Sequence, residues 1–321
     1  MKRRVIVDTD PGIDDALALM LAVKSPEISL EGVTIVPGNV TLERGAYNAL
    51  RVLDAIGADY IPVFLGANAP LERQLEPVTK VNGTDGLGDC SWPLTERSVE
   101  NISAVDFLIT QARLYPKELT LICLGPLTNL AQAIITDAEA MALYEEIVIF
   151  GGAARVTGNV SPVAEFNFWT DPEAARLVFS WAKVPLTVVG LDISHKVILN
   201  PIHREFLNLI DTATSQLVYQ ITNYLLRVNW EMEHRLGCGI HDPLAVAAIV
   251  LPEVFSWENH TVDIATDGLC RGQMVVDYKG FWQRAKNSRL AVDIKADRFL
   301  EEYIVRMTAE KLSLQEVRKY F

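Results

Sequence analysis

Residues 5–17 read VIVDTDPGIDDAL, a short apolar run followed by four aspartates. The apolar residues predict a buried strand, and the Pro-Gly pair at 11–12 predicts a sharp turn after it. Asp14 and Asp15 then fall in the first turn of a helix predicted over 16–23, where the helix dipole favours anions. Carboxylates this close together raise one another's pKa unless a cation neutralises them, and Ca²⁺ or Mg²⁺ suits oxygen ligands. A solvated acidic turn that caps the helix is the alternative interpretation.

Apolar runs alternate with amphipathic stretches along the first 200 residues. Strands are predicted at 5–7, 30–36, 61–65, 119–124, 147–150 and 186–189, and helices at 16–23, 42–56, 104–114, 127–135 and 171–181. This alternation predicts an α/β fold with a doubly wound, mostly parallel central sheet flanked by helices. Residues 66–98 read as a long loop, and later residues predict helices at 203–235, 243–250 and 297–309 and strands at 261–264 and 274–278. No linker or internal repeat interrupts the pattern, so we expect a single domain over 1–321.

Composition and charge exclude several classes of protein. The chain has 321 residues, half of them apolar, which is ample for a buried core. Its 41 acidic and 29 basic residues give a net charge of −12, which disfavours nucleic acid as a partner. No apolar run approaches the roughly 20 residues needed to cross a membrane, and residues 1–8 do not resemble a signal peptide. The four cysteines show no paired spacing, so we expect a reduced, cytoplasmic protein with Cys123 in the core.

Further polar residues stand where predicted strands end or helices begin. Asn39 follows the strand at 30–36, and ligands of open parallel sheets bind outside the carboxyl ends of strands. Glu165 and Asn167 are two residues apart, and a strand there would place both on one face. Asp242 precedes a proline and an apolar run, the pattern of a helix N-cap, and the same carboxylate could also reach a cation.

Taken in order, these motifs resemble those of the inosine-uridine preferring nucleoside hydrolase family, which cleaves the N-glycosidic bond of ribonucleosides. The family's opening motif, DTDPGxDDA, stands at residues 8–16. Further matches are PGNV at 37–40, GLG at 86–88, LGPLTN at 124–129, GG at 151–152, TGN at 157–159, PVAEFN at 162–167, DPEAA at 171–175 and HDPLAV at 241–246. The matches span essentially the whole chain, and the resemblance implies a hydrolase that releases free base and ribose.

The resemblance also implies a role for individual residues. It implies a calcium ion (Ca²⁺) held by Asp10, Asp15, Asp242 and the backbone carbonyl of Leu124, with Asp10 as general base on a bound water. It implies that the sugar is bound by Asp14, Asn39, Asn159, Glu165 and Asn167, that His241 assists departure of the base, and that Trp230 lies near the base. It further implies a homodimer or homotetramer that acts in nucleoside salvage.

One departure from the family and two competing functions bear on these roles. Many family members have a histidine where this chain has Asn82, so one possible acid for the leaving group is missing. The base site falls in variable segments around 75–90 and 222–236, and the sequence leaves the preferred base open. A non-catalytic nucleoside-binding member of the family is one alternative. A Mg²⁺-dependent phosphatase of the haloacid dehalogenase type is the other, but Gly12 stands where that family has Thr or Val.

Overall fold

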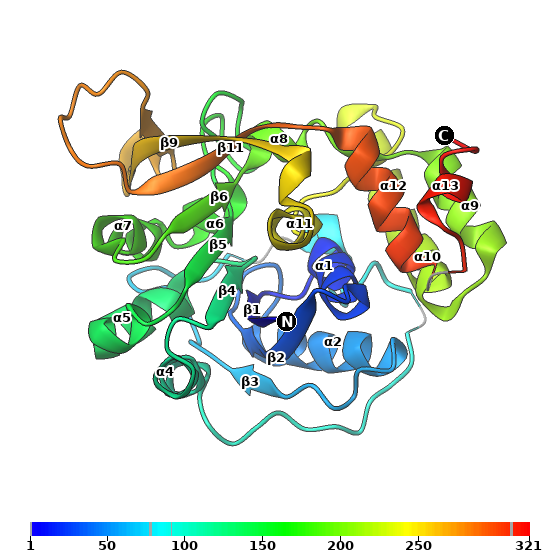
Figure 1. Ribbon diagram of the computed structural model, residues 1–321, viewed down its shortest axis with the longest axis horizontal. Helices are drawn as coiled ribbons and strands as arrows, with labels where there is room; N and C mark the ends of the chain where they lie inside the picture. Colours follow the sequence, from blue (N-terminus) through cyan, green and yellow to red (C-terminus); the bar gives the residue numbers. More distant parts are fainter. Residues whose placement is uncertain (1, 77–78, 91, 309–310) are drawn as a thin grey trace.

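The computed structural model describes residues 2–76, 79–90, 92–308 and 311–321 and is built around a nine-stranded sheet (Figure 1). The strand order is β10-β9-β11-β6-β5-β4-β1-β2-β3. The strands are β1 (Arg3–Thr9), β2 (Ile28–Ile35), β3 (Val63–Leu65), β4 (Leu119–Cys123), β5 (Glu146–Phe150), β6 (Leu186–Val189), β9 (Phe255–Ile264), β10 (Met274–Asp277) and β11 (Ser288–Ile294). β1 to β6 and β11 run parallel, whereas β9 and β10 are antiparallel to their neighbours. The predicted fold class is confirmed.

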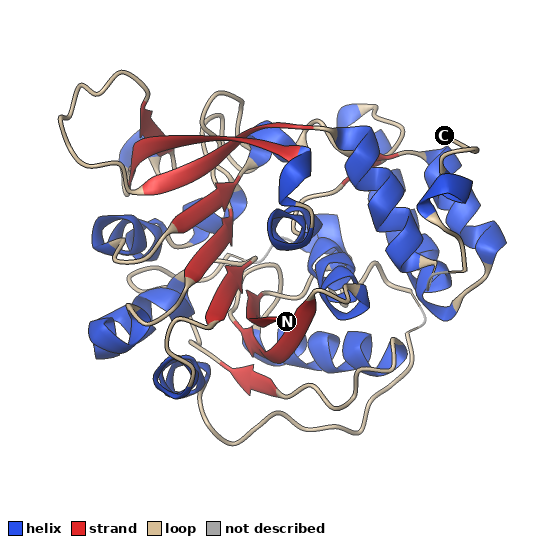
Figure 2. Cartoon of the chain, in the orientation of Figure 1, coloured by secondary structure: helices blue, strands red, loops and turns tan. Residues whose placement is uncertain are grey.

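Helices cover both faces of this sheet (Figures 1 and 2). One face carries α4 (Ala104–Leu114), α5 (Thr128–Met141) and α7 (Pro172–Trp181), and the other carries α1 (Ile13–Lys24), α2 (Leu42–Ala55), α11 (Pro243–Val250) and α12 (Ala296–Met307). Each face has its own buried apolar cluster, and the alternation of β1 supplies both: Val5 and Val7 pack into one, Ile6 into the other.

The remaining elements are short, except for the helices α9 and α10, which contact α12. They are α3 (Thr79–Asn82), α6 (Phe166–Thr170), α8 (Leu191–Ser194), α9 (Pro201–Ile210), α10 (Ala213–Glu233), α13 (Leu314–Val317), the 3₁₀ turns Pro252–Val254 and Gly268–Cys270, and the strands β7 (Ile198–Leu199) and β8 (Cys238–Gly239). The single helix predicted over 203–235 is two helices, because Asp211 ends α9 in the left-handed conformation with φ 55°. The strand β11 was not predicted.

The connections of β1 position the functional site. The chain runs from β1 outward through β2 to β3, then returns to place β4 on the other side of β1. Such a reversal leaves a crevice at the carboxyl ends of the two diverging strands, here β1 and β4. The segment after β1 carries the aspartates, and Leu124 follows β4.

Two smaller predictions about the chain can also be compared with this structure. Cys123 is fully buried in β4, as predicted, and all four cysteines are free thiols. Within the described residues, every helix is too short or too polar to span a membrane.

Candidate active site

A cavity opens where β1, β2, β4 and β5 end, between the α10 helix and the start of α11. Among the predicted site residues, those that line it are Asp14, Asn39, Leu124, Asn159, Glu165, Asn167, His241 and Asp242. Asp10 and Asp15 are 1% and 0% exposed and lie in the same carboxylate group below this lining. The structure therefore brings together ten residues that the sequence spreads over more than 230 positions.

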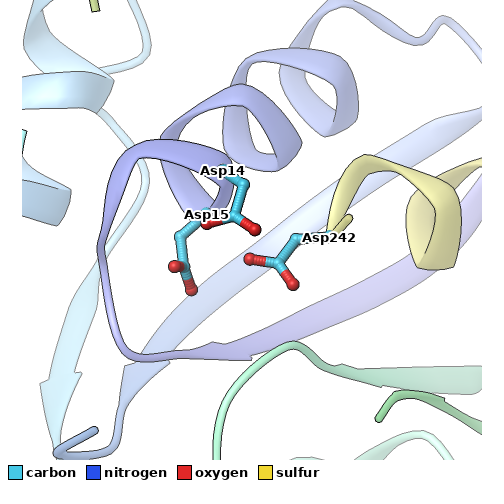
Figure 3. A group of neighbouring side chains, drawn as sticks. All are labelled: Asp14, Asp15 and Asp242. Carbon is cyan, nitrogen blue, oxygen red and sulfur yellow. The ribbon is translucent and has the colours of Figure 1, made fainter. Parts of the chain in front are cut away.

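Three carboxylates converge in this cavity from two helix N-termini (Figure 3). Asp14 and Asp15 start α1, Asp242 precedes α11, and each offers an oxygen within 4.8 Å of the others. Asp242 is the N-cap residue of α11, and a proline stands in its first turn, as predicted. Its side chain makes no capping hydrogen bond, however, so the carboxylate is free to face the other two. This group could hold a metal ion.

Asp15 is the most firmly held of these carboxylates. Its Oδ1 accepts hydrogen bonds from the Thr9 hydroxyl and from the Asp10 amide, the latter at 3.2 Å. Its Oδ2 accepts from the Gly12 amide at 3.0 Å and from Asn39 Nδ2 at 3.1 Å. These donors fix the orientation of the carboxylate before any ligand arrives.

Asp10 is packed between two backbone segments. Its Oδ2 accepts from the Asn39 amide at 2.7 Å, whereas its buried Oδ1 has no hydrogen-bond partner among the described residues. A Cβ at Gly38 would lie 2.1 Å from Oδ2, and a Cβ at Gly125 would lie 2.6 Å from Oδ1. Glycine is therefore required at both positions for the loops after β2 and β4 to approach this carboxylate.

The electrostatics of the group favour a bound cation. Burial, with the neighbouring carboxylates, raises the pKa of Asp10 and of Asp242 well above the ordinary aspartate value. Burial and the charge of Asp15 raise the pKa of Asp14 to about 7. A hard divalent cation offsets both causes, because it restores the lost solvation and neutralises the repulsion. The unpartnered Oδ1 of Asp10 and the all-oxygen donor set fit such an ion.

The side of the cavity where the sugar is expected is formed by the start of α6. Glu165 and Asn167 do not lie in a strand, the case in which one face would carry both: Glu165 is the N-cap of α6, and its carboxylate accepts from the amides of Asn167 (2.8 Å), Phe168 (3.3 Å) and Gly152 (3.0 Å). Burial raises the pKa of Glu165 to about 7. Both predicted side chains still line the cavity, because the first turn of a helix can turn neighbouring side chains toward one site.

The side-chain amides of Asn167 and Asn159 complete this side of the cavity. Asn167 Nδ2 donates to the carbonyls of Leu124 at 2.6 Å and Phe150 at 3.2 Å, which joins α6 to the ends of β4 and β5. Asn159 Oδ1 accepts from the Phe166 amide at 3.0 Å. The Leu124 carbonyl, a predicted metal ligand, thus already accepts one hydrogen bond at the cavity wall.

The opposite end of the cavity is more apolar. His241 lies there, with its Nδ1 2.9 Å from the Ser194 hydroxyl, and burial lowers its pKa to about 4. One face of α10 forms the wall through Leu225, Val228, Asn229 and Met232. Trp230 lies on the same helix but is 49% exposed, packs edge-on against His234 and is not among the lining residues. Its assignment to the substrate stays a prediction.

Two features of the site were not predicted. Residues 225, 228, 229 and 232 have the spacing of a single helix face, whereas Trp230, the residue expected near the base, lies on the adjacent face. Asn82 is 3% exposed, accepts from the Ile13 amide at 3.0 Å and donates to Asn39 Oδ1 at 2.9 Å. It joins the long loop to both the start of α1 and a predicted ribose ligand.

Comparison with known proteins identifies the family to which the chain is similar. The family model of the inosine-uridine preferring nucleoside hydrolases matches residues 5–301. An inosine-uridine preferring nucleoside hydrolase of Leishmania major is 38% identical over 92% of this chain and 94% of its own length. Uridine nucleosidase 1 of Arabidopsis thaliana is 36% identical over 85% of this chain and 82% of its own length.

Solved structures give the same result. A plant nucleoside hydrolase, PpNRh1, superposes with a TM-score of 0.92 at 33% identity, covering 96% of this chain and all of its own. A purine-preferring ribonucleoside hydrolase from Gardnerella vaginalis gives 0.91 at 32% identity, covering 97% of this chain and all of its own. The chain therefore belongs to the inosine-uridine preferring nucleoside hydrolase family and is an enzyme that hydrolyses the N-glycosyl bond of ribonucleosides.

Proposed function

We propose that the enzyme is Ca²⁺-dependent and that Asp10 is its general base. The observation that carries the proposal is the convergence of Asp14, Asp15 and Asp242 beside the unpartnered Oδ1 of Asp10. Asp10, Asp15, Asp242 and the Leu124 carbonyl would hold the ion. When bound there, Ca²⁺ would orient the ribose hydroxyls and lower the pKa of water at the site.

The chain's own residues account for the rest of the reaction. Breaking the C1′–N bond builds positive charge on the ribose, and the surrounding carboxylate and amide oxygens stabilise that charge. The Asp10 carboxylate takes the proton of the attacking water. Its Oδ2 is occupied by the Asn39 amide, so the carboxylate cannot turn away from the cavity without losing that bond.

Substrate binding is divided along the cavity. Asp14 and Asn39, which line the cavity, would bind the ribose hydroxyls, and Asn159, Glu165 and Asn167 would bind the sugar at its 5′ side. His241 lies at the base end and assists departure of the base, and Trp230 is retained as a base-side prediction. The named relatives include a uridine nucleosidase and a purine-preferring hydrolase, so we propose activity on purine and/or pyrimidine ribonucleosides.

Location and assembly complete the proposal. The free thiols suit a reducing cytoplasm, where the enzyme would act in nucleoside salvage as a homodimer or homotetramer. Light scattering of the full chain measures the assembly directly.

The test is release of reducing sugar from inosine, uridine, cytidine, adenosine and guanosine, with and without a chelator. We expect ribose release that the chelator abolishes and that added Ca²⁺ restores. The ratio among the five substrates gives the base preference. Release that persists in chelator would contradict the metal requirement. No release from any substrate by the folded, Ca²⁺-loaded protein would favour the non-catalytic, nucleoside-binding alternative.

A further inference from the structure

His241 makes one side-chain hydrogen bond in the described part of the chain, and its partner lies outside the cavity. Its Nδ1 is 2.9 Å from the hydroxyl oxygen of Ser194, the last residue of α8. Ser194 is completely buried and does not line the cavity, whereas His241 does. The serine therefore reaches the cavity only through the imidazole.

The direction of this hydrogen bond follows from the acceptors around the serine. Buried hydroxyls on other helices donate to the carbonyl four residues earlier: Ser25 to Leu21 at 2.6 Å, and Thr222 to Val218 at 2.6 Å. For the Ser194 hydroxyl, the described residues offer His241 Nδ1 as the one acceptor. A buried hydroxyl that left its hydrogen unbonded would carry a free-energy cost, so the hydroxyl donates and Nδ1 accepts.

The tautomer of the neutral ring is then fixed. With Nδ1 accepting, the ring hydrogen is on Nε2. Nε2 has no hydrogen-bond partner among the residues that the structure describes, and the ring lies at the cavity wall, tilted against Phe150 at 5.9 Å between centroids. An Nε2–H donor is thus available to whatever occupies the base end.

The short helix that carries Ser194 is itself held firmly. The Leu191 amide donates to the Gly152 carbonyl at 2.9 Å, and a Cβ at Gly190 would lie only 2.5 Å from that oxygen. The Asp192 carboxylate accepts from the amides of Ala154 and Arg155, both at 2.8 Å. These contacts fix α8 to the segment that leads to Asn159, so the serine hydroxyl has a defined position relative to the sugar side.

We infer that Ser194 is a positioning residue that holds the His241 ring with its Nε2–H directed at the departing base. As the C1′–N bond breaks, its electron pair moves onto the base, and a donor directed there stabilises the leaving group. The hydrogen-bond direction stands on the structure alone, whereas its use in catalysis rests on the proposed function. The two are tested separately.

The first experiment determines the tautomer of His241 by NMR and does not depend on enzyme activity. The full chain is labelled with ¹⁵N-histidine, and long-range ¹H–¹⁵N spectra are recorded on the wild type; the His241→Ala variant assigns the signal among the five histidines. We expect the Nε2–H form for His241. The Nδ1–H form would overturn the inference, whatever the enzyme's activity.

The second experiment tests the effect on catalysis. We expect Ser194→Ala to lower kcat about three- to tenfold, the effect of one hydrogen bond, with little change in KM. Ser194→Thr keeps a hydroxyl donor and should recover most of the loss. Ser25→Ala is the matched control, because it removes another buried serine hydroxyl, 2% exposed, that lies outside the cavity, and kcat should not change.

A double-mutant cycle separates positioning from general destabilisation. In the His241→Ala background, Ser194→Ala should have no further effect on kcat, because the serine acts through the ring. An equal loss in both backgrounds would overturn the inference. If the wild type shows no hydrolysis, the proposed function fails, and the NMR result still decides the orientation of the ring.

Discussion

The two ends of the cavity are built in different ways. At the end that we propose binds the sugar, backbone and side-chain donors fix several polar side chains: Asp15 accepts four hydrogen bonds, and Glu165 accepts three from amides. At the base end, one face of α10 supplies an apolar wall, and His241 makes one side-chain hydrogen bond within the described residues. At the sugar end, oriented carboxylates are ready to stabilise positive charge. At the base end, the shape of the cavity depends on a few side chains of one helix face.

This difference matches the chemistry that each end performs. The ribose and the charge that develops on it are common to all ribonucleosides, so one rigid set of oxygens serves every substrate. The base differs between substrates, and the named relatives include both uridine-cleaving and purine-preferring enzymes. Substitutions at the sugar end should therefore reduce kcat for all nucleosides alike, and substitutions at the base end should change the ratio among them.

The largest effect is expected for Asp10→Asn. The variant keeps the shape of the side chain but removes the base, so kcat should fall about 10²- to 10⁴-fold, by a similar factor for inosine and uridine. Ribose release measures the loss. Asp54→Asn is the control, because Asp54 pairs with Arg97 away from the cavity. A loss confined to one nucleoside would contradict the separation of the two ends.

Removal of the metal should stop turnover and also destabilise the fold. A ligand that binds only the native state at about 100 times its Kd stabilises it by about 2.7 kcal/mol. We therefore expect Ca²⁺ to raise the Tm of chelator-treated protein, and Asp242→Asn to reduce that rise. Scanning calorimetry measures both. An equal rise in Tm for Asp242→Asn and the wild type would exclude this carboxylate as a ligand.

Local sequence rules predicted the sugar end well and the base end poorly. The turn after β1, the acidic first turn of α1 and the Asp242 cap all follow from contacts between near neighbours. The N-cap role of Glu165 is not visible in the local sequence, because glutamate is an uncommon N-cap and its bonds include one from the distant Gly152 amide. β11 was missed because it is defined by pairing with β6 and β9, which the local pattern does not encode.

The wall formed by α10 shows the same limit of prediction from the local sequence. Residues 225, 228, 229 and 232 have helical spacing on one face of α10, and Trp230 lies on the adjacent face. Periodicity identifies the helix but does not tell which face meets the cavity. That choice is made by tertiary packing, here against the helices α9, α3 and α1 and the strand β8.

Without metal, the stability of the protein should fall as the pH rises. Burial raises the pKa of Asp14 and of Glu165 to about 7 from ordinary values of 3.8 and 4.5. Between these values the folded state binds more protons than the unfolded chain, so ΔG of unfolding decreases with pH. The contribution is fully present below pH 3.8 and is lost as the pH rises through about 7.

Thermal unfolding in chelator from pH 5 to 8 measures this decline. Glu165→Gln removes one of these titrations and should flatten the slope, and added Ca²⁺ should raise Tm more at pH 8 than at pH 5. An identical slope in the variant and the wild type would show that Glu165 does not titrate in this range.

The smallest effect is expected at the base end, where Met232 and Trp230 can be compared directly. Met232 lines the cavity although it is 66% exposed, and Trp230, 49% exposed, packs against His234 on the adjacent face. Truncating a partly exposed side chain that contacts the base removes about 1 kcal/mol of contact, so Met232→Ala should raise KM about fivefold. The rise should differ between inosine and uridine, because a two-ring base contacts more of the wall, and kcat should hold because the carboxylates are untouched. Trp230→Ala should change KM less than about twofold if its ring contacts only His234. A larger effect of Trp230→Ala would show that the tryptophan contacts the base. It would also mean that α10 moves toward the cavity when the substrate binds.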